Sequence, residues 1–297
     1  MMKKSLVSRR LLVFLIVCFS VTWSAWGILG WLARARQLVY GPWPFMLLYV
    51  LGGLGPMIGA YVAVLSTSSQ APLREFHQRL FRWRIAGWWY AVAIGLPVAL
   101  AIVSTMIAML FRPDLSNVLS IRPWYMFAPL LAVMIVGGGL EEPGWRGIAQ
   151  PEIARTTGSA KAALLVGLVW ALWHVPLFFL SGVSQYGSNF PVFALGVVGM
   201  ALMLGWLYSR TASILLCVVF HAAANAITAL GVAIPREAGH LTLLSPCLHV
   251  LIGVVLLLAA WARSDERLAI GAMSTPQIRR RTVIHHVPRF VGVLRIR

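Results

Sequence analysis

The sequence predicts an all-α protein, a polytopic membrane bundle of about eight transmembrane helices. Of its 297 residues, 60% are hydrophobic and only 11% are charged, whereas soluble domains carry about 25% charged residues. The mean hydropathy is +0.82. A helix needs about 20 apolar residues to cross a bilayer, and the stretches that meet this requirement are 11–33, 44–66, 88–111, 124–145, 161–181, 190–209, 211–233 and 243–262.

The basic residues are distributed as in a membrane protein rather than a nucleic-acid-binding protein. The formal net charge is +17 at pH 7. With eight crossings, 20 of the 25 Lys and Arg residues fall on the side of the N-terminus. Such residues gather in the cytoplasmic loops of membrane proteins. We therefore expect one membrane domain, residues 1–262, in a bacterial inner membrane, and a basic cytoplasmic tail, residues 263–297. Both termini are then cytoplasmic, and the partner is the lipid bilayer, not nucleic acid.

Two adjacent carboxylates, Glu141 and Glu142, stand at the end of the fourth apolar stretch. Ionisable side chains at membrane depth are costly and mark functional sites. Glu142 precedes Arg146 by four residues, the favourable order for a helical ion pair, although Pro143 disfavours helix at Glu142. We expect Glu142 and Arg146 to support the structure and Glu141 to be free for chemistry. The alternative is that the pair only caps the edge of the membrane.

Two later stretches also place polar side chains among apolar ones. His174 lies well inside the stretch 161–181, and His221 and Asn225 lie in 211–233. Residues four apart share one face of a helix. A carboxylate bonded to a histidine can deprotonate a water, and a second histidine with an amide can stabilise the resulting oxyanion. These groups suffice for amide hydrolysis.

A zinc site is the alternative use of the same side chains. Glu141, His174 and His221 could be three ligands of a catalytic zinc ion with one open position. The HExxH signature of soluble zinc proteases is absent from the sequence.

The pattern resembles the CPBP family (CAAX protease and bacteriocin-processing, or Abi) of intramembrane proteases, which includes the Ras-converting CAAX endopeptidase. Three family motifs occur in order on three separate spans. They are EExxxR at Glu141, Glu142 and Arg146, FxxxH at His174 with Trp170 in place of the usual phenylalanine, and HxxxN at His221 and Asn225. The resemblance covers roughly residues 130–230 and places the catalytic core at about 124–233.

The resemblance implies a membrane-embedded endopeptidase in which Glu141 and His174 activate water, and His221 with Asn225 form the oxyanion hole. The family has been described both as zinc-dependent and as glutamate-dependent. We favour the metal-free mechanism, which requires no cofactor, because Asn225 is a better oxyanion donor than zinc ligand. The implied substrate is a peptide or a membrane-associated protein. Eukaryotic members cleave prenylated CAAX proteins, and some bacterial members are associated with bacteriocin immunity.

Two other functions compete with proteolysis. A proton-coupled transporter would show inverted repeats with broken helices in matching positions, and the sequence shows no such pairing. A non-catalytic membrane scaffold or bacteriocin-immunity protein would not need the complete Glu–His–His–Asn set. For a protease, we expect Glu141, His174, His221 and Asn225 to converge around one cavity that opens toward the basic cytoplasmic rim.

Overall fold

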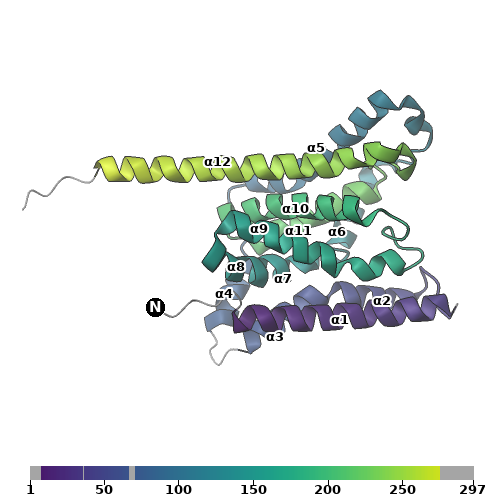
Figure 1. Cartoon of the computed structure of the whole chain (residues 1–297), viewed down its shortest axis with the longest axis horizontal. Coiled ribbons are helices and arrows are strands. Elements are labelled where there is room, and N and C mark those ends of the chain that lie inside the picture. The colour runs from purple at the N-terminus through teal and green to yellow at the C-terminus, as the bar shows by residue number, and fades with distance from the viewer. Residues whose placement is uncertain (1–7, 36, 67–70, 275–297) are drawn as a thin grey trace, which may run out of the picture. The chain divides into compact units, whose positions relative to one another are not determined.

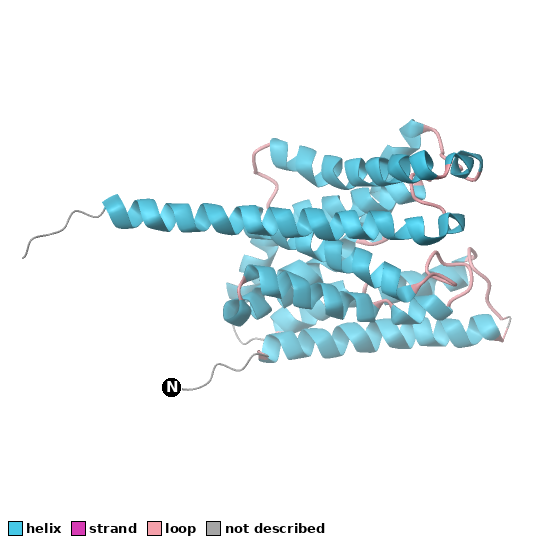
Figure 2. Cartoon of the chain, turned by 45° about the horizontal axis from the view of Figure 1, so that its top comes forward, coloured by secondary structure: helices cyan, strands magenta, loops and turns pink. Residues whose placement is uncertain are grey.

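The computed structural model describes residues 8–35, 37–66 and 71–274. These residues contain no strand, so the predicted all-α fold is confirmed (Figure 2). In chain order (Figure 1), the elements are α1 (Arg9–Arg34), α2 (Trp43–Gly53), α3 (Gly55–Leu65), α4 (Ala71–Leu80), α5 (Trp88–Phe111), η1 (Pro113–Asn117), η2 (Trp124–Met126), α6 (Phe127–Val136), η3 (Gly139–Glu141), α7 (Glu142–Gly144), η4 (Trp145–Ala149), α8 (Gln150–Thr157), α9 (Ser159–Trp173), η5 (Val175–Phe179), α10 (Phe190–Thr211), α11 (Ile214–Ala229), η6 (Arg236–Leu243) and α12 (Leu244–Ser274).

Six helical segments in the described part of the chain are long and apolar enough to cross a membrane. They are Arg9–Arg34, Trp88–Phe111, Trp124–Thr157, Ser159–Phe179, Phe190–Thr211 and Arg236–Ala260. The helices α2 and α3 meet at a 45° bend, and the number of spans is seven if this pair is counted as one. The predicted tail, 263–297, begins within α12, and its residues 275–297 lie outside the described residues.

The predicted seventh span, 211–233, is a shorter helix. The corresponding element, α11, has 16 residues, fewer than the roughly 20 that cross a bilayer unaided. It packs against α5, α6 and α10, and most of its side chains are buried. A helix surrounded by protein has little contact with lipid, so its length need not match the bilayer.

The fourth span breaks in the middle, where the acidic motif begins. No residue of α6 is buried, whereas every residue from Glu141 to Gln150 is buried. Three glycines, residues 137–139, join the two parts, and Gly138 has φ 156°, a conformation that favours glycine. A short π-helix, η4, follows. Such single turns of π-helix are frequent at functional sites.

One end of the bundle carries most of the basic residues of the described part and is called the basic end below. It comprises the start of α1, helices α4 and α8, and the turn from α10 to α11. Two contacts join these segments. Arg10 Nη1 lies 3.5 Å from Glu152 Oε1, and Arg79 Nη1 donates to Tyr208 Oη at 2.7 Å.

The opposite end of the bundle is called the rim. It contains the loop 180–189 before α10 and the segment 230–243 between α11 and α12. Arg236 joins the two, because its guanidinium donates to the carbonyl oxygens of Ser184 and of Tyr186, the latter at 2.9 Å. The rim is therefore a connected structure rather than a set of separate loops.

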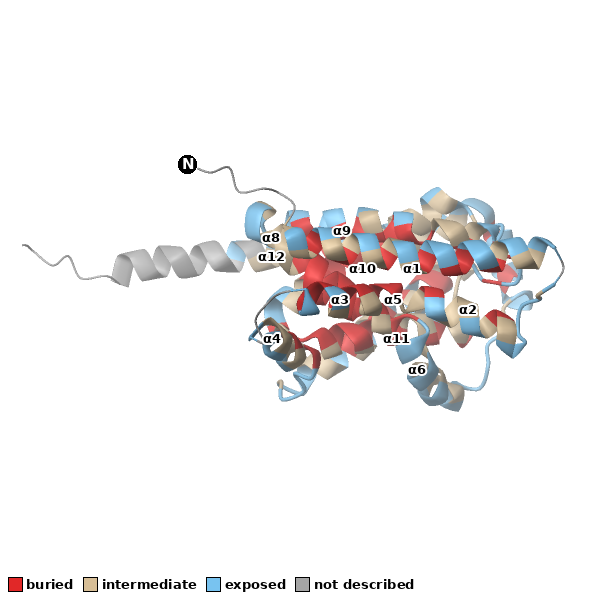
Figure 3. Cartoon of the chain, turned by 90° about the horizontal axis from the view of Figure 1, so that it is seen from below, coloured by how far each residue is buried: buried red, intermediate tan, exposed pale blue. Residues whose placement is uncertain are grey.

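Large apolar side chains cover much of the outside of the helices. Leu110, Phe111 and Trp124 are more than 70% exposed, and Figure 3 shows buried residues gathered along the middle of the bundle. An apolar exterior over this many helices is expected where lipid replaces water. The chain is therefore an integral, multi-pass membrane protein.

Candidate active site

The four polar side chains singled out from the sequence line one cavity. Its volume is about 890 Å³. Glu141, His174, His221 and Asn225 all contribute to its wall, together with Trp170. The predicted convergence is thus confirmed for their positions, and their catalytic roles stay predictions.

Glu141 is held by a tryptophan. The indole Nε1 of Trp170 donates to Glu141 Oε2 at 2.6 Å, and both side chains are buried. A hydrogen bond to a carboxylate is shorter and about twice as strong as one between neutral groups. The bond fixes Oε2, and Oε1 makes no hydrogen bond within the described residues.

The same tryptophan contacts a buried arginine through its ring. The guanidinium carbon of Arg146 lies 4.7 Å from the ring centroid of Trp170, a favourable cation–π distance. Arg146 Nη1 lies 2.9 Å from Glu142 Oε2, with both side chains fully buried. The predicted ion pair therefore forms despite Pro143. The N–H groups of Arg146 are not aligned on Glu142 Oε2 as a hydrogen bond requires. Charge attraction to Glu142 and contact with the aromatic face of Trp170 together hold Arg146.

Glu142 has a second partner. His221 Nδ1 lies 2.8 Å from Glu142 Oε1, where it donates to the carboxylate. This contact makes Nδ1 the protonated nitrogen. Nε2 then points toward Gly138, because a β-carbon built on that glycine would lie 2.8 Å from Nε2. Glu142 thus both neutralises Arg146 and orients His221.

The end of α9 fixes His174. The helix stops at Trp173, because Pro176 has no N–H to continue it. His174 Nδ1 bonds to the carbonyl oxygen of Trp170 at 2.8 Å, one of the carbonyls that a helix end leaves without a backbone partner. With the proton on Nδ1, the lone pair of Nε2 is available as an acceptor.

Asn225 reaches the break in the fourth span. Its Nδ2 donates to the carbonyl oxygen of Gly137 at 3.1 Å. A β-carbon on Gly138 would lie only 2.3 Å from Asn225 Nδ2, so no side chain fits at that position. The amide nitrogen carries two hydrogens, and the bond to Gly137 uses one of them.

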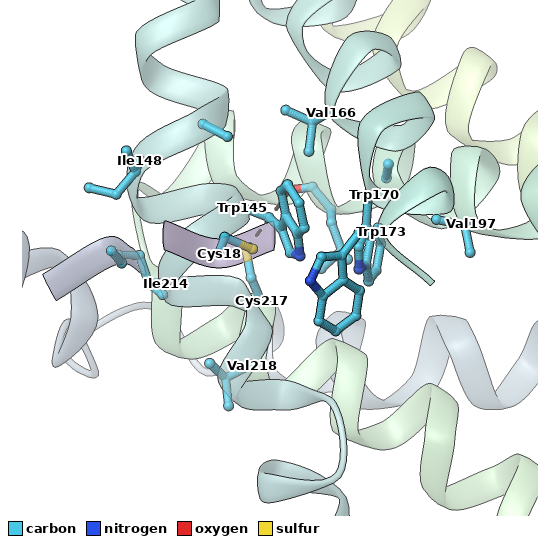
Figure 4. Close-up of a cluster of buried hydrophobic side chains, with 14 of the residues drawn as sticks. Cys18, Trp145, Ile148, Val166, Trp170, Trp173, Val197, Ile214, Cys217 and Val218 are labelled. Carbon is cyan, nitrogen blue, oxygen red and sulfur yellow. Dashed lines mark hydrogen bonds between the residues drawn. The ribbon is translucent and has the colours of Figure 1, made fainter. Parts of the chain in front are cut away.

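Three tryptophans, Trp145, Trp170 and Trp173, lie together in the buried cluster that Figure 4 shows. Trp170 and Trp173 line the cavity, and Trp145 packs behind them, with ring centroids 6.4 Å and 6.2 Å away, respectively. Trp173 Nε1 donates to Thr22 Oγ1 at 2.9 Å, which ties the site to α1. Trp145 Nε1 has no hydrogen-bond partner among the described residues.

The donor set for a metal ion is not assembled. Within residues 8–35, 37–66 and 71–274, no group of three or more His, Cys, Asp or Glu side chains is placed to hold a metal. Glu141 Oε2 and His221 Nδ1 bond to Trp170 and Glu142 instead. Glu141, His174 and His221 nevertheless line the same cavity, so the zinc alternative stays a prediction.

The expectation that the cavity opens toward the basic residues, at the basic end of the bundle, is wrong. Its lining residues come from the half of the bundle nearer the rim, including Gln185, Ser188, Asn189 and Thr242. Arg236 is the one Lys or Arg among the described residues that line it. The reason is the broken fourth span. From Gly139 onward the chain packs into the core and closes the bundle on the basic side.

Comparison with known proteins shows what this part of the chain resembles. Residues 123–227 match the family model for type II CAAX prenyl endopeptidases, described as Rce1-like. A similar protein, CAAX prenyl protease 2 of Methanococcus maripaludis, is 26% identical over 191 residues, which are 60% of this chain and 69% of that protein. Residues 123–227 are therefore similar to Rce1-like intramembrane proteases, and this segment is called the Rce1-like domain below.

The Rce1-like domain holds all three motifs and therefore all the polar groups described above. Its cavity nevertheless needs walls from outside residues 123–227, supplied by Trp26 of α1, Tyr49 of α2 and Pro97 of α5. Two contacts in the Rce1-like domain were not foreseen: the bond from Trp170 to Glu141 and the bond from His221 to Glu142. The one available signal was Trp170, which stands where phenylalanine is usual.

Proposed function

We propose that the Rce1-like domain hydrolyses peptide bonds within the membrane and uses Glu141 as the general base. The observation that carries this proposal is the position of Glu141. Its carboxylate is fixed at one oxygen by Trp170, in a cavity that His174 also lines. A general base needs to be oriented and within reach of a water. A transporter or a scaffold does not require a carboxylate oriented in this way.

The reaction begins when Glu141 Oε1 takes a proton from a water, with the lone pair of His174 Nε2 as a second acceptor. The water oxygen then forms a bond to the carbonyl carbon, and the π electrons of the carbonyl move to its oxygen. Glu141 passes the proton to the amide nitrogen. The C–N bond breaks as the carbonyl re-forms, which releases a carboxylic acid and an amine, and the proton of the acid then passes to the amine to give a carboxylate and an ammonium group.

His221 and Asn225 stabilise the oxyanion. Asn225 donates with the second hydrogen of Nδ2. His221 acts as an imidazolium, whose Nδ1–H binds Glu142 and whose Nε2–H donates to the oxyanion. Hydrogen-bond donors that already point to the oxygen that becomes negative in the transition state usually contribute most to such reactions. Each donor contributes about 10²–10³-fold in rate. Arg146 and Glu142 support the site by holding His221 and the ring of Trp170.

The mechanism uses no metal ion and no cofactor. The substrate is a peptide or a membrane-associated protein, since the cavity lies among membrane helices. The relative from Methanococcus maripaludis is named as a prenyl protease, which places prenylated proteins among the classes to test. Both chain termini are cytoplasmic, with the protein in a bacterial inner membrane, because the basic end then faces the cytoplasm.

The test compares protein N-termini in membranes that carry the wild type or Glu141→Gln. The variant keeps the shape and the hydrogen bond to Trp170 but lacks the base, so we expect folded protein and loss of all cleavage products. Glu75→Gln is the matched control, because it makes the same chemical change at an exposed residue of α4. Full activity of Glu141→Gln would refute the proposal and favour a transporter or scaffold.

A further inference from the structure

The residues that join α4 to α5, called the 81–85 segment below, lie at the basic end and have no part in the proposed mechanism. The segment is placed at the ends of two spans. Two residues separate it from the span Trp88–Phe111. Ser213, which follows the span Phe190–Thr211, donates from Oγ to the carbonyl oxygen of Arg82 at 2.8 Å. A segment tied to the ends of two membrane-crossing helices lies at the depth of the lipid head groups.

Hydrogen bonds hold the backbone of the 81–85 segment. Tyr90 Oη donates to the carbonyl oxygen of Trp83 at 2.7 Å, and the N–H of Ile85 donates to the same oxygen at 2.9 Å. The side chain of Ile85 also packs against the buried core. Together with the bond from Ser213, these contacts fix the main chain, so a ligand of this segment would not have to order it first.

Four consecutive side chains of the segment, residues 81–84, are exposed. Phe81 is 64% exposed and Trp83 is 61% exposed. The guanidinium carbon of Arg84 lies 5.1 Å from the ring centroid of Trp83, an arrangement that orients the guanidinium and leaves its N–H groups free. Neither Arg82 nor Arg84 forms an ion pair with a carboxylate of the described residues. The segment therefore displays two unpaired cations beside two aromatic rings.

This combination fits the head group of an anionic phospholipid. A guanidinium binds phosphate oxygens through two parallel N–H groups, and basic residues beside a membrane surface attract anionic lipid. Aromatic rings are enriched at the depth of the head groups, whereas a soluble anion would gain nothing from exposed rings. We propose that the 81–85 segment binds an anionic phospholipid, with Arg82 and Arg84 on its phosphate and the rings of Phe81 and Trp83 against its glycerol and upper acyl chains.

Two other arginines of the basic end already have a carboxylate partner. Arg10 Nη1 lies 3.5 Å from Glu152 Oε1, and Arg155 Nη1 lies 3.1 Å from Glu152 Oε2. The side chain of Arg155 is 73% exposed, so it is as accessible to lipid as the 81–85 segment is. It differs from Arg82 and Arg84 in being paired, which makes it the matched control for charge alone.

The 81–85 segment is also bonded to the helix that carries His221. Ser213 Oγ, which donates to Arg82, accepts from the N–H of Leu216 at 3.2 Å and thereby caps α11. A ligand that binds only the folded protein stabilises it. Binding of the lipid should therefore raise the melting temperature of the bundle.

Lipid titration of the full-length protein in a neutral detergent tests this site. Dioleoylphosphatidylglycerol is the anionic lipid, dioleoylphosphatidylcholine is the lipid without net charge, and glycerol 3-phosphate is a soluble source of the same phosphate. Native mass spectrometry gives the Kd of each, and melting temperatures are recorded with and without lipid. The variants are the double replacement Arg82→Gln and Arg84→Gln, Trp83→Ala, and the control Arg155→Gln. All four positions are exposed, and the melting temperature without lipid shows whether each variant folds.

We expect the wild type to bind phosphatidylglycerol about tenfold more tightly than phosphatidylcholine, and to melt at a higher temperature with it. The double variant should weaken this binding about 25-fold, because each basic residue beside an anionic surface contributes about fivefold. Trp83→Ala should also weaken it at unchanged net charge, whereas Arg155→Gln should leave the Kd within about twofold. An unchanged Kd in the double variant, or an equal loss in Arg155→Gln, would overturn the proposal. Glycerol 3-phosphate that binds as tightly as the lipid would overturn it too. No substrate is present, so the result is independent of the proposed proteolysis.

Discussion

Replacement of Trp170 by phenylalanine tests the contact that holds Glu141. Trp170→Phe keeps an aromatic ring beside Arg146 but removes the indole N–H that lies 2.6 Å from Glu141 Oε2. A hydrogen bond to a charged group contributes about 1.5–3 kcal/mol. If this bond orients the base in the transition state, its loss lowers kcat by about 10- to 150-fold, at about 1.36 kcal/mol for each tenfold change in rate.

Two neighbouring tryptophans serve as matched controls for the loss of ring volume. Trp173→Phe removes an equally buried indole, whose Nε1 donates to Thr22 Oγ1. Trp145→Phe removes an Nε1 that has no partner in the described residues. Both controls lower the melting temperature as Trp170→Phe does, because each leaves a small void. Neither indole N–H bonds to Glu141, so we expect kcat to change less than threefold.

The assay measures kcat and KM in detergent or nanodiscs, with a fluorogenic peptide built on a cleavage site found in the comparison of N-termini. Melting temperatures are recorded for the same preparations. For Trp170→Phe we expect a lower kcat with little change in KM, because the bond acts on the base and not on substrate binding. An unchanged kcat, or an equal loss in Trp173→Phe, would show that Trp170 serves only packing.

Four further predictions concern the same site. Glu142→Gln leaves the charge of Arg146 unpaired in the core and should lower the free energy of unfolding by about 3–5 kcal/mol, measured by denaturant titration; an unchanged midpoint would contradict the ion pair. Asn225→Ala should slow kcat by about 10²–10³-fold with folding intact, and a smaller effect than tenfold would remove Asn225 from the oxyanion hole. Gly138→Ala places a β-carbon 2.3 Å from Asn225 Nδ2 and should abolish activity, whereas an active variant would mean that Asn225 moves freely. Chelators should leave the activity of the purified enzyme unchanged, and inhibition that zinc reverses would refute the metal-free mechanism.

The architecture and the motif residues followed from local sequence. Apolar stretches of about 20 residues gave the spans, because a bilayer imposes that length on any helix that crosses it. The ion pair between Glu142 and Arg146 followed from their separation by four residues. The length of α11 was not predicted. This helix is buried by α5 and α6, and its own sequence does not indicate those contacts.

The contacts that orient the site depend on tertiary packing. Trp170 and Glu141 are 29 residues apart, and His221 and Glu142 are 79 residues apart. No periodicity of a helix relates residues at such separations. The entrance was also misplaced, because charge alone located the cytoplasmic side, whereas the open end of the cavity is decided by where the fourth span breaks.

The glycines at 137–139 also separate two parts of the cavity wall that are held differently. No residue of α6 is buried, and this helix packs mainly against α11, while the chain beyond Gly138 is packed in the core. Rotation about the glycines would displace α6 as a lever without disturbing Glu141. Because Asn225 is bonded to the Gly137 carbonyl at the pivot, the same rotation would withdraw its amide. A movement of α6 that admitted a bulky segment would then also take apart the proposed oxyanion hole.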